Sequence, residues 1–472
     1  MRILFINPPM QYPVNYPGPN RVVMQHDFAP PLGLMSISAF IKQNGYDDVE
    51  LIQGQTKRPP TDENILETVD TYKPDVVGIT VSTVTYYNAI RIASLIKSVR
   101  PQTVLVVGGP HVTIYPEETA SQPPVDFAVV GEGEYTFLEL LRALEKSGSL
   151  EPIQGLVWKR DGQTVMNPPR QFNEPLDALP MPDYSICDLK EHRIRFDDIA
   201  PTGIIITSRG CPFRCTFCCV IYPYYRERSA ETVVDEMERL KALGYRSVTF
   251  WDDTFNLSRE RVVRICQLIQ ERNLKLPWSF RGRVTGVDDE LASILSKAGC
   301  VRASFGVESG NQDRLDKIKK GITIEQVQEA FSACKKHGIQ IMAFFMMGFP
   351  HETAEEAQRT VQFAFELDPD YAVFHTLLPL PGTEIYQEAM AAGAFPDYIR
   401  TFARHPTPDF QIRLWETGMT QKELYHLYRM TILRFYFRPT YIWKTLRRIH
   451  SLENFLTKIK TALSVLVRLH YR

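Results

Sequence analysis

The sequence predicts an α/β protein. A doubly wound parallel sheet opens the chain, a partial (β/α)6 barrel follows, and a helical region ends it. Two observations predict this class. Short apolar runs rich in Val and Ile alternate with helical patterns through residues 1–147, and the alternation resumes at residue 200. Near-continuous apolar strands separated by helices are typical of parallel sheets covered on both faces.

The first domain, residues 1–147, contains five expected strands, at residues 2–7, 49–53, 75–82, 103–109 and 126–134. In such a sheet, ligands bind beyond the carboxyl ends of the strands. Small or glycine residues stand at three of these ends, in "VSTVT", "GGPH" and "GEGE", so the backbone can approach a large ligand closely there. The sequence therefore predicts a binding face at this edge. The alternative is that each turn simply needs a glycine.

Residues 148–199 are expected to form a hairpin and a proline-rich linker. The hairpin spans residues 153–166 and turns at Asp161 and Gly162. The linker, "NPPRQFNEPLDALPMPDY", is a natural domain boundary.

Residues 200–395 form the second expected domain. Its expected strands lie in the runs "GIIITSRG", "SVTFWDD", "WSFRGRV", "RASFGVES", "IQIMAFFMMGFP" and "DYAVFHTLLPLPG". Six strand–helix units suggest a full or partial barrel. The chemistry of such a barrel lies at the C-terminal ends of its strands.

Residues 396–472 change in character. From residue 425 onward, Lys and Arg are interleaved with aromatic residues, and Glu453 is the single acid. Such a segment can form amphipathic helices that lie on an anionic membrane surface. The alternative is a helical cap that packs on the barrel and keeps its basic face in water.

Charge and hydropathy indicate where in the cell the protein is expected. The formal net charge of −1 gives no overall attraction to nucleic acid. We find neither a signal-peptide core nor an apolar run of about 18 residues. We therefore expect a cytoplasmic protein, with peripheral contact at the inner face of the membrane if the C-terminal helices bind lipid. Clustered cysteines in a reducing compartment bind metal more often than they form disulfides.

The stretch Ser208–Cys219, "SRGCPFRCTFCC", holds four of the eight cysteines. Its C-x3-C-x2-C spacing lets a short loop aim the thiolates of Cys211, Cys215 and Cys218 at one point. A structural zinc site normally needs four ligands in two short-spaced pairs, and no second pair is present. Three thiolates would hold three irons of a [4Fe–4S] cluster and leave one iron open to a small molecule.

This run resembles the signature of the radical S-adenosylmethionine (SAM) superfamily, and the resemblance extends over roughly residues 200–390. It implies that SAM binds the open iron and is cleaved to a 5′-deoxyadenosyl radical, with an external electron donor of the flavodoxin or ferredoxin type. No catalytic residue beyond the cluster ligands is implied. The candidate SAM contacts are Phe217, Asp252, Asp253, Asn256, Arg281, Glu308 and Gly348. For each carboxylate the alternative is a solvated loop or a salt bridge.

Residues 1–147 resemble the cobalamin-binding domain that precedes this barrel in one large subfamily, on "ILFINPP", "APPLGLMSISAFIKQNGY", "GGPHVTIYPEET" and "DFAVVGEGE". The D-x-H-x-x-G motif of better-known cobalamin folds is missing, since His26 precedes Asp27. The resemblance thus implies cobalamin without a histidine on its lower face. The alternative is a fold that no longer binds a corrinoid. The candidate cobalamin contacts are Ser82, Thr83, Gly108, Gly109, His111, Glu132 and Gly133.

Similar proteins include anaerobic magnesium-protoporphyrin monomethyl ester cyclases and radical SAM enzymes of hopanoid biosynthesis. The resemblance implies an enzyme that methylates or otherwise modifies an unactivated carbon of an apolar small molecule, isoprenoid, hopanoid-like or tetrapyrrole. One alternative is a radical SAM oxidative cyclase or oxidoreductase without methyl transfer. Another is a non-catalytic sensor that binds a corrinoid and a cluster. A methylthiotransferase acting on transfer RNA is disfavoured, because only Cys187 precedes the loop.

Overall fold

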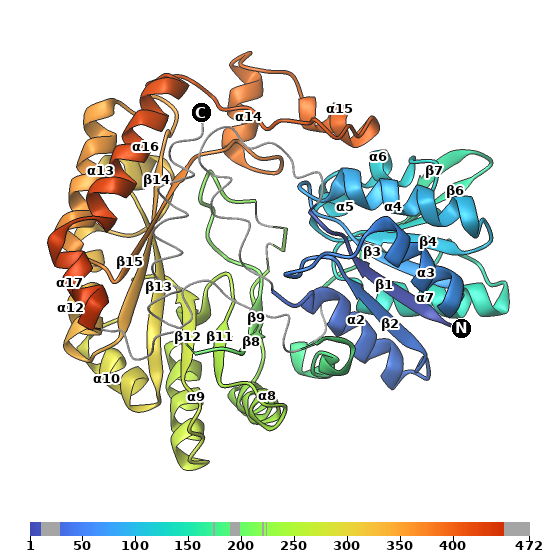
Figure 1. Cartoon of the computed structure of the whole chain (residues 1–472), viewed down its shortest axis with the longest axis horizontal. Helices are drawn as coiled ribbons and strands as arrows, with labels where there is room; N and C mark the ends of the chain where they lie inside the picture. Colours follow the sequence, from blue (N-terminus) through green and yellow to red (C-terminus); the bar gives the residue numbers. More distant parts are fainter. Residues whose placement is uncertain (11–28, 173–174, 189–198, 220, 223, 448–472) are drawn as a thin grey trace.

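The computed structural model describes residues 1–10, 29–172, 175–188, 199–219, 221–222 and 224–447. Two α/β units face each other, and a helical segment runs from the second unit back to the first (Figure 1). The loop with His26 and Asp27 and the C-terminal residues 448–472 lie outside the described part, as do the predictions made for them.

The first unit is built on one seven-stranded sheet with the order β2-β1-β3-β4-β5-β6-β7. Its strands are β1 (Ile3–Asn7), β2 (Val49–Gln53), β3 (Val76–Thr80), β4 (Val104–Gly108), β5 (Phe127–Val129), β6 (Leu156–Arg160) and β7 (Gln163–Met166). The first five pair in parallel, whereas β6 and β7 are antiparallel. The order 2-1-3-4-5 has its topological switch point beside β1, where ligands bind in doubly wound sheets.

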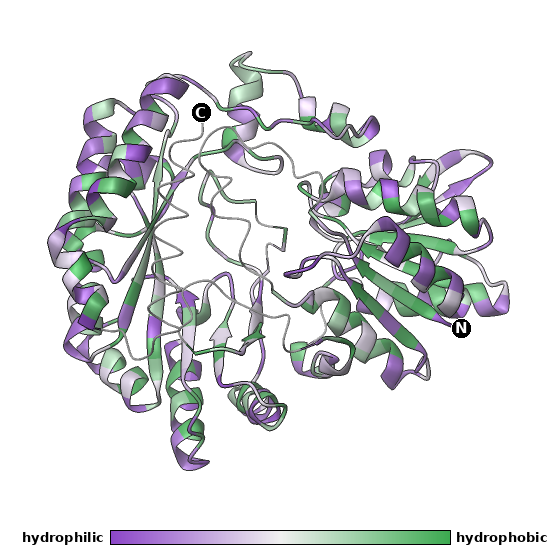
Figure 2. Ribbon diagram, in the orientation of Figure 1, coloured by the Kyte–Doolittle hydropathy of each residue, from purple (hydrophilic) through white to green (hydrophobic). Residues whose placement is uncertain are grey.

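Helices cover both faces of this sheet: α2 (Leu32–Gln43), α3 (Asp62–Tyr72), α4 (Tyr86–Val99), α5 (Pro110–Ile114), α6 (Pro116–Ala120) and α7 (Glu134–Lys146). Alternation along β1 explains the two cores. Ile3 and Phe5 are buried with residues of α2 and α7, while Leu4 and Ile6 are buried with residues of α3 and α4. Figure 2 shows these strands as largely hydrophobic, between helices that each carry a hydrophilic side.

The second unit is an open, all-parallel barrel of six strands in the order β15-β14-β13-β12-β11-β8. Its strands are β8 (Thr202–Ile205), β11 (Ser247–Phe250), β12 (Trp278–Gly282), β13 (Cys300–Glu308), β14 (Gln340–Met347) and β15 (Tyr371–Thr376). Its outer helices are α8 (Ala230–Ala242), α9 (Arg259–Glu271), α10 (Asp289–Lys297), α11 (Gln312–Lys317), α12 (Ile324–Lys336) and α13 (Ala354–Leu367).

The chain leaves the barrel through α14 (Glu384–Ala391) and α15 (Tyr398–Arg404), and then adds α16 (Gln421–Tyr436) and α17 (Pro439–Arg447). Side chains of α14 and α15 complete one of the two cores of the first unit. The Ala403 carbonyl accepts hydrogen bonds from the Tyr86 hydroxyl (2.6 Å) and the Gln122 amide (3.0 Å). Helix α16 instead packs on β15 and α13 of the barrel. The C-terminal region therefore connects the two units.

The predicted architecture is confirmed: a doubly wound sheet, a partial six-stranded barrel and a helical C-terminal region. The predicted hairpin also forms, with positive φ at Asp161 (52°) and Gly162 (78°), as its tight turn requires. It extends the sheet of the first unit as β6 and β7, although the sequence grouped it with the linker. Among the described residues, no helix is long and apolar enough to cross a membrane.

Candidate active site

The cysteine loop leaves the barrel directly after β8. Its base is closed by the antiparallel pair β9 (Ser208–Arg209) and β10 (Arg226–Glu227). Gly210, the residue before the first cysteine, has φ of +85°, and a Cβ there would lie 2.2 Å from the carbonyl oxygen of Tyr224. Only glycine fits this position without moving the backbone. The close contact between Gly210 and Tyr224 therefore fixes the position of the backbone just before Cys211.

The three thiols of the motif share one small region. The amide of Cys218 donates to the carbonyl of Cys215 at 3.0 Å, and the sulfur of Cys211 lies 3.7 Å from the Thr254 hydroxyl. Solvent reaches Cys218, yet the surrounding protein raises the pKa of its thiol to about 12. Burial is the main cause, and the Cys215 and Cys211 thiols add to it. The sulfurs are thus close enough to repel one another as thiolates.

This donor set fits a [4Fe–4S] cluster. Within the part of the chain that the structure describes, no group of three or more His, Cys, Asp or Glu converges as ligands of one metal ion. A cluster makes a different demand, since each thiolate binds a separate iron. The fourth thiol of the loop, Cys219, lies elsewhere: a Cβ on Gly382 would stand 2.6 Å from its sulfur.

Three of the predicted SAM contacts lie close to the cysteine loop. The ring of Phe217 stands edge-on to Phe349 at 6.1 Å, next to Gly348, whose φ is +85°. Glu308 ends β13 and forms an ion pair of 2.7 Å with Lys320, whose ammonium lies 5.8 Å from the Phe217 ring. The structure therefore brings Phe217, Glu308 and Gly348 together around the loop.

Two other candidate SAM contacts form hydrogen bonds with backbone groups of the protein. Asp252 is buried at the end of β11, where it accepts hydrogen bonds from the amides of Thr207 (2.6 Å) and Ser208 (3.1 Å). Asn256 accepts from the Arg283 amide at 2.9 Å and donates to the Arg283 carbonyl at 2.8 Å. In these contacts Asp252 supports the base of the cysteine loop, and Asn256 fixes the backbone just beyond β12.

The last two candidates lie beyond β11 and on β12. Asp253 follows Asp252, and burial raises the pKa of its carboxyl. It adds to the raised pKa of Cys218 and also lines the cavity described next. Arg281 stacks on Trp251, with its guanidinium 4.0 Å from the ring centre.

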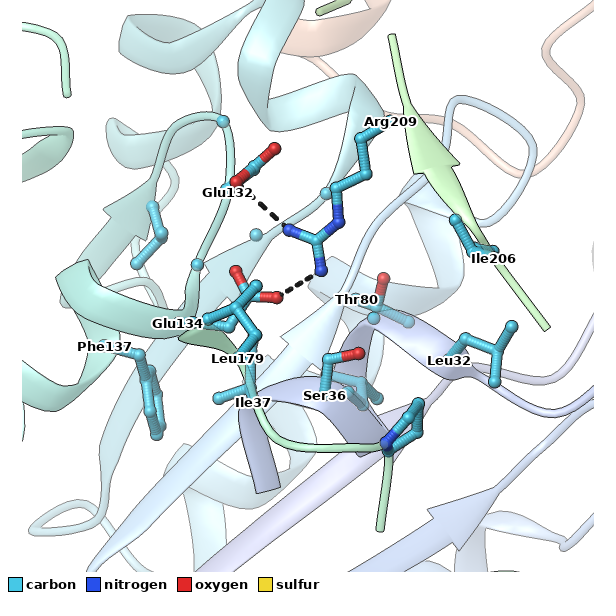
Figure 3. A pocket seen from close by; sticks show the side chains of 18 of the residues that line it. Leu32, Ser36, Ile37, Thr80, Glu132, Glu134, Phe137, Leu179, Ile206 and Arg209 are labelled. Carbon is cyan, nitrogen blue, oxygen red and sulfur yellow. Dashed lines mark hydrogen bonds and ion pairs between the residues drawn. The ribbon is translucent and has the colours of Figure 1, made fainter. Parts of the chain in front are cut away.

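A cavity of about 460 Å³ lies between the two units. The first unit contributes the ends of its strands and helix α2, and the second contributes the residues just before Cys211. Figure 3 shows Thr80, Ser36 and Leu179 around it, with Arg209 reaching across from the barrel side. Glycine makes this wall close-fitting: a Cβ on Gly133 would lie 2.8 Å from Ile37 Cδ1, and one on Gly109 would lie 2.9 Å from the Val81 carbonyl. These glycines therefore let the strand ends pack closely against their neighbours in the wall of the cavity.

Four of the predicted cobalamin contacts line this cavity: Gly108, Gly109, Glu132 and Gly133. The other three do not line it. The amide of Ser82 donates to the Thr85 hydroxyl at 3.1 Å, and the Thr83 hydroxyl lies 3.0 Å from His111 Nδ1. His111 is fully buried against the ring of Tyr86, and burial lowers its pKa to about 3. It is a neutral core histidine.

Arg209 is a site residue that the sequence reasoning missed. Its guanidinium pairs with Glu132 (3.1 Å) and Glu134 (2.6 Å) of the first unit, and Glu132 also pairs with Arg226. Burial alone would lower the pKa of Arg209, but the two carboxylates raise it above its ordinary value. The signal was present, since "SRGC" places a cation beside the motif and "GEGE" offers two carboxylates at a strand end.

The loop after β14 is held by Glu352, a fully buried carboxylate. Its Oε2 accepts hydrogen bonds from the amides of Gly348 (2.6 Å) and Phe349 (3.3 Å), while Oε1 finds no partner among the described residues. Burial raises the pKa of Glu352 from 4.5 to about 7, against the effect of the Gly348 amide.

This shift predicts a pH dependence. The raised pKa contributes stability that is complete below pH 4.5 and lost as the pH rises through 7, by about 3 kcal/mol. We expect urea unfolding at pH 5 and pH 8 to show most of that loss in the parent and not in Glu352→Gln. The exposed Glu329→Gln is the control and should behave as the parent. Equal pH dependence in all three would contradict the assignment.

Comparisons with known proteins agree with this geometry. The family model of the radical SAM superfamily matches residues 205–364, and that of the B12 binding domain matches residues 25–141. An uncharacterised methyltransferase of Pyrococcus horikoshii is 34% identical over 100% of this chain and 99% of its own length. The anaerobic magnesium-protoporphyrin IX monomethyl ester cyclase of Rubrivivax gelatinosus is 32% identical over 82% of this chain and 70% of its own.

Solved structures share the fold. The radical SAM methyltransferase TsrM of Kitasatospora setae, with cobalamin and a [4Fe–4S] cluster bound, is 23% identical with a TM-score of 0.68, over 84% of this chain and 79% of its own. The cobalamin-dependent enzyme OxsB, with aqua-cobalamin and SAM bound, is 18% identical with a TM-score of 0.74, over 98% of this chain and 72% of its own.

Fold, motif and cavity together define a radical SAM enzyme with a B12-binding domain. The chain belongs to the cobalamin-dependent enzymes of the radical SAM superfamily. The predicted cofactors, a [4Fe–4S] cluster, SAM and cobalamin, are confirmed at the level of the family, and so is the prediction of an enzyme. The non-catalytic sensor is not favoured.

Proposed function

We propose that this protein methylates an unactivated carbon of an apolar small molecule. One observation carries the proposal: a single cavity is bounded by the glycine-rich strand ends of the B12-binding domain and by the residues that lead into Cys211. When bound there, the three cofactors supply hydrogen-atom abstraction and a methyl group. The protein's own residues bind them, orient them and exclude water.

The contacts above support the following assignments. Cys211, Cys215 and Cys218 hold the cluster. Phe217, Glu308 and Gly348 surround the position of SAM next to it. Gly108, Gly109 and Gly133 let the corrinoid approach the strand ends of a cobalamin-binding domain over residues 1–147, and residues 200–395 form the catalytic barrel. Reduction of the cluster requires an electron, and we propose an external donor of the flavodoxin or ferredoxin type as its source.

Oxidation without methyl transfer is the second candidate function, and the relationship to the Rubrivivax cyclase favours it. An assay without substrate distinguishes the two candidates. The anaerobically reconstituted protein receives reductant, hydroxocobalamin and SAM labelled in its methyl group. A methyltransferase should form S-adenosylhomocysteine and labelled corrinoid as well as 5′-deoxyadenosine. Formation of 5′-deoxyadenosine alone would contradict methyl transfer and support oxidation.

The names of relatives allow more than one substrate class. A hopanoid C-3 methylase of Methylococcus capsulatus is 27% identical over 84% of this chain, and a cytidylyl-2-hydroxyethylphosphonate methyltransferase of Streptomyces wedmorensis is 26% identical over 80%. The first acts on an apolar molecule and the second on a polar one. The surface of α17 supports the apolar class for this chain.

Helix α17 has no buried residue. Ile442, Trp443 and Leu446 are 42%, 57% and 47% exposed, with Arg447 stacked over Trp443 at 4.8 Å. An apolar helix face beside a cation fits the interface of an anionic lipid membrane. We propose that α17 contacts such a membrane, where an apolar substrate is available.

Vesicle co-sedimentation tests the membrane proposal. We expect binding to phosphatidylglycerol vesicles, weaker binding to phosphatidylcholine vesicles, and a loss of about tenfold or more in Trp443→Ser/Leu446→Ser, since burying two large apolar side chains stabilises binding by several kcal/mol. Val99→Ser is the control, because Val99 is 51% exposed on α4 of the other unit. Equal sedimentation of the double variant and the parent would contradict the proposal.

A further inference from the structure

Two cations lie beneath the cysteine loop, and each faces an aromatic ring of that loop. The guanidinium of Arg283 stands 3.7 Å from the ring centre of Phe213, and the ammonium of Lys320 stands 5.8 Å from that of Phe217. Arg283 also donates a hydrogen bond to the carbonyl of Lys320, which links the two. Cation and ring attract each other through the ring quadrupole. The cysteine loop therefore packs against two positively charged side chains.

Backbone contacts also hold the cysteine loop against the segment that carries Lys320. The amide of Thr216, in the middle of the loop, donates to the carbonyl of Ile318 at 3.0 Å, two residues before Lys320. Lys319 and Gly321 have positive φ of 54° and 63°, so the segment turns tightly on both sides of Lys320. The turn therefore fixes the lysine next to the loop.

Lys320 is also paired inside the barrel. Its ammonium lies 2.7 Å from the carboxylate of Glu308, and both side chains are only 9% exposed. Gly306 makes room for the pair: a Cβ there would lie 2.4 Å from Glu308 Oε1 and 2.7 Å from Lys320 Nζ. Glu308 itself has φ of +67°, after an irregularity in the pairing of β13 with β14. Strain of this kind persists where the surrounding structure enforces it, and it clusters at functional sites.

The charge of Lys320 lies close to the cysteines. Its ammonium faces the ring of Phe217, the residue next to Cys218, at 5.8 Å. Within the ion pair with Glu308, the ammonium is therefore the group that faces the cysteine loop. Reduction adds a negative charge to an iron–sulfur cluster, and nearby net charge is one of the properties that set its potential. A buried cation next to a ligand therefore favours the reduced form.

We infer that Lys320 is a positioning and charge-supplying residue: it holds Glu308 in the barrel and makes the cluster on Cys211, Cys215 and Cys218 easier to reduce. The inference rests on the proposed function, because it needs the cluster at these cysteines. Its readout is the cluster's reduction potential, which a merely structural lysine would not change.

The test is a redox titration, followed by electron paramagnetic resonance, of anaerobically reconstituted protein without SAM. The variants are Lys320→Arg, Glu308→Gln and Lys320→Met/Glu308→Gln, the last of which leaves no buried charge unpaired. At a fixed potential, the ratio of reduced to oxidised cluster should fall by roughly tenfold in the double variant. It should rise in Glu308→Gln and stay near the parent in Lys320→Arg. The matched control is Arg359→Met, which removes a cation stacked on Phe363 of the outer helix α13.

Iron and sulfide content separate the two possible failures. A parent that binds no cluster overturns both the proposed function and this inference. If all variants bind the parental amount of iron, and the double variant and Glu308→Gln keep the parental potential, only the inference about Lys320 is overturned. A shift of equal size in Arg359→Met would also overturn it, because the effect would then not depend on the position of the charge.

Discussion

Cys215→Ala is expected to lose SAM cleavage down to the background rate. Two thiolates of the proposed triad, Cys211 and Cys218, then remain, and they could hold only two of the irons that the three cysteines would hold in the parent. The variant should also lose most of its iron and sulfide after anaerobic reconstitution. Release of 5′-deoxyadenosine, together with iron content, measures both effects. Folding is not expected to suffer greatly, because Cys215 is only partly buried.

Cys219→Ala is the matched control for this experiment. Cys219 stands in the same loop, but its sulfur lies against Gly382. The variant should keep its iron and its rate of SAM cleavage. If Cys215→Ala bound iron and cleaved SAM as the parent does, the cysteine triad would be wrong. If Cys219→Ala lost both, the ligand set would have to include the fourth thiol.

Arg209→Met is expected to destabilise the protein by about 3 kcal/mol and to weaken the retention of hydroxocobalamin. Arg209 joins the two units through Glu132 and Glu134, whose side chains are only 12% and 5% exposed. Glu132 keeps its ion pair with Arg226, but Glu134 loses its partner, and removing one partner of a largely buried ion pair typically costs 3–5 kcal/mol. The first transition in urea unfolding, read by tryptophan fluorescence, measures stability. Absorbance of the corrinoid after gel filtration measures retention.

Arg160→Met provides the comparison for Arg209→Met. Its partner is Glu151, and the two side chains are 47% and 55% exposed. A pair in water contributes about 0.5 kcal/mol or less. Equal destabilisation by both substitutions would contradict the role of Arg209. Arg209→Lys should fall in between, because a lysine cannot offer two carboxylates the fork of a guanidinium.

The fold was largely predictable because its elements carry local signals. The strands around Ile79 and Val106 are continuous apolar runs, as strands buried on both faces must be. The turn at Asp161 and Gly162 follows from the chemistry of tight hairpins. The sequence did not reveal which sheet the hairpin joins, because edge pairing with β5 depends on tertiary contacts.

The site was predictable only in part, for a related reason. The proposed cysteine triad lies within eight residues, so the local spacing was enough to predict it. The partners of Glu132 lie 77 residues or more away along the chain, in Arg209 and Arg226, and no local pattern connects them. His111 was equally ambiguous: a histidine in a loop motif can face a ligand or the core, and only packing against Tyr86 and Tyr115 decides.

The contact between α15 and the first unit has a consequence for how the chain matures during synthesis. The Tyr86 hydroxyl and the Gln122 amide both donate to Ala403, and Phe402 joins the same core. During translation, the B12-binding domain leaves the ribosome some 250 residues before α15 does. Until then an apolar patch of the domain remains uncovered. Fragments that stop short of residue 403 should therefore aggregate, and protection by chaperones should matter most in that interval.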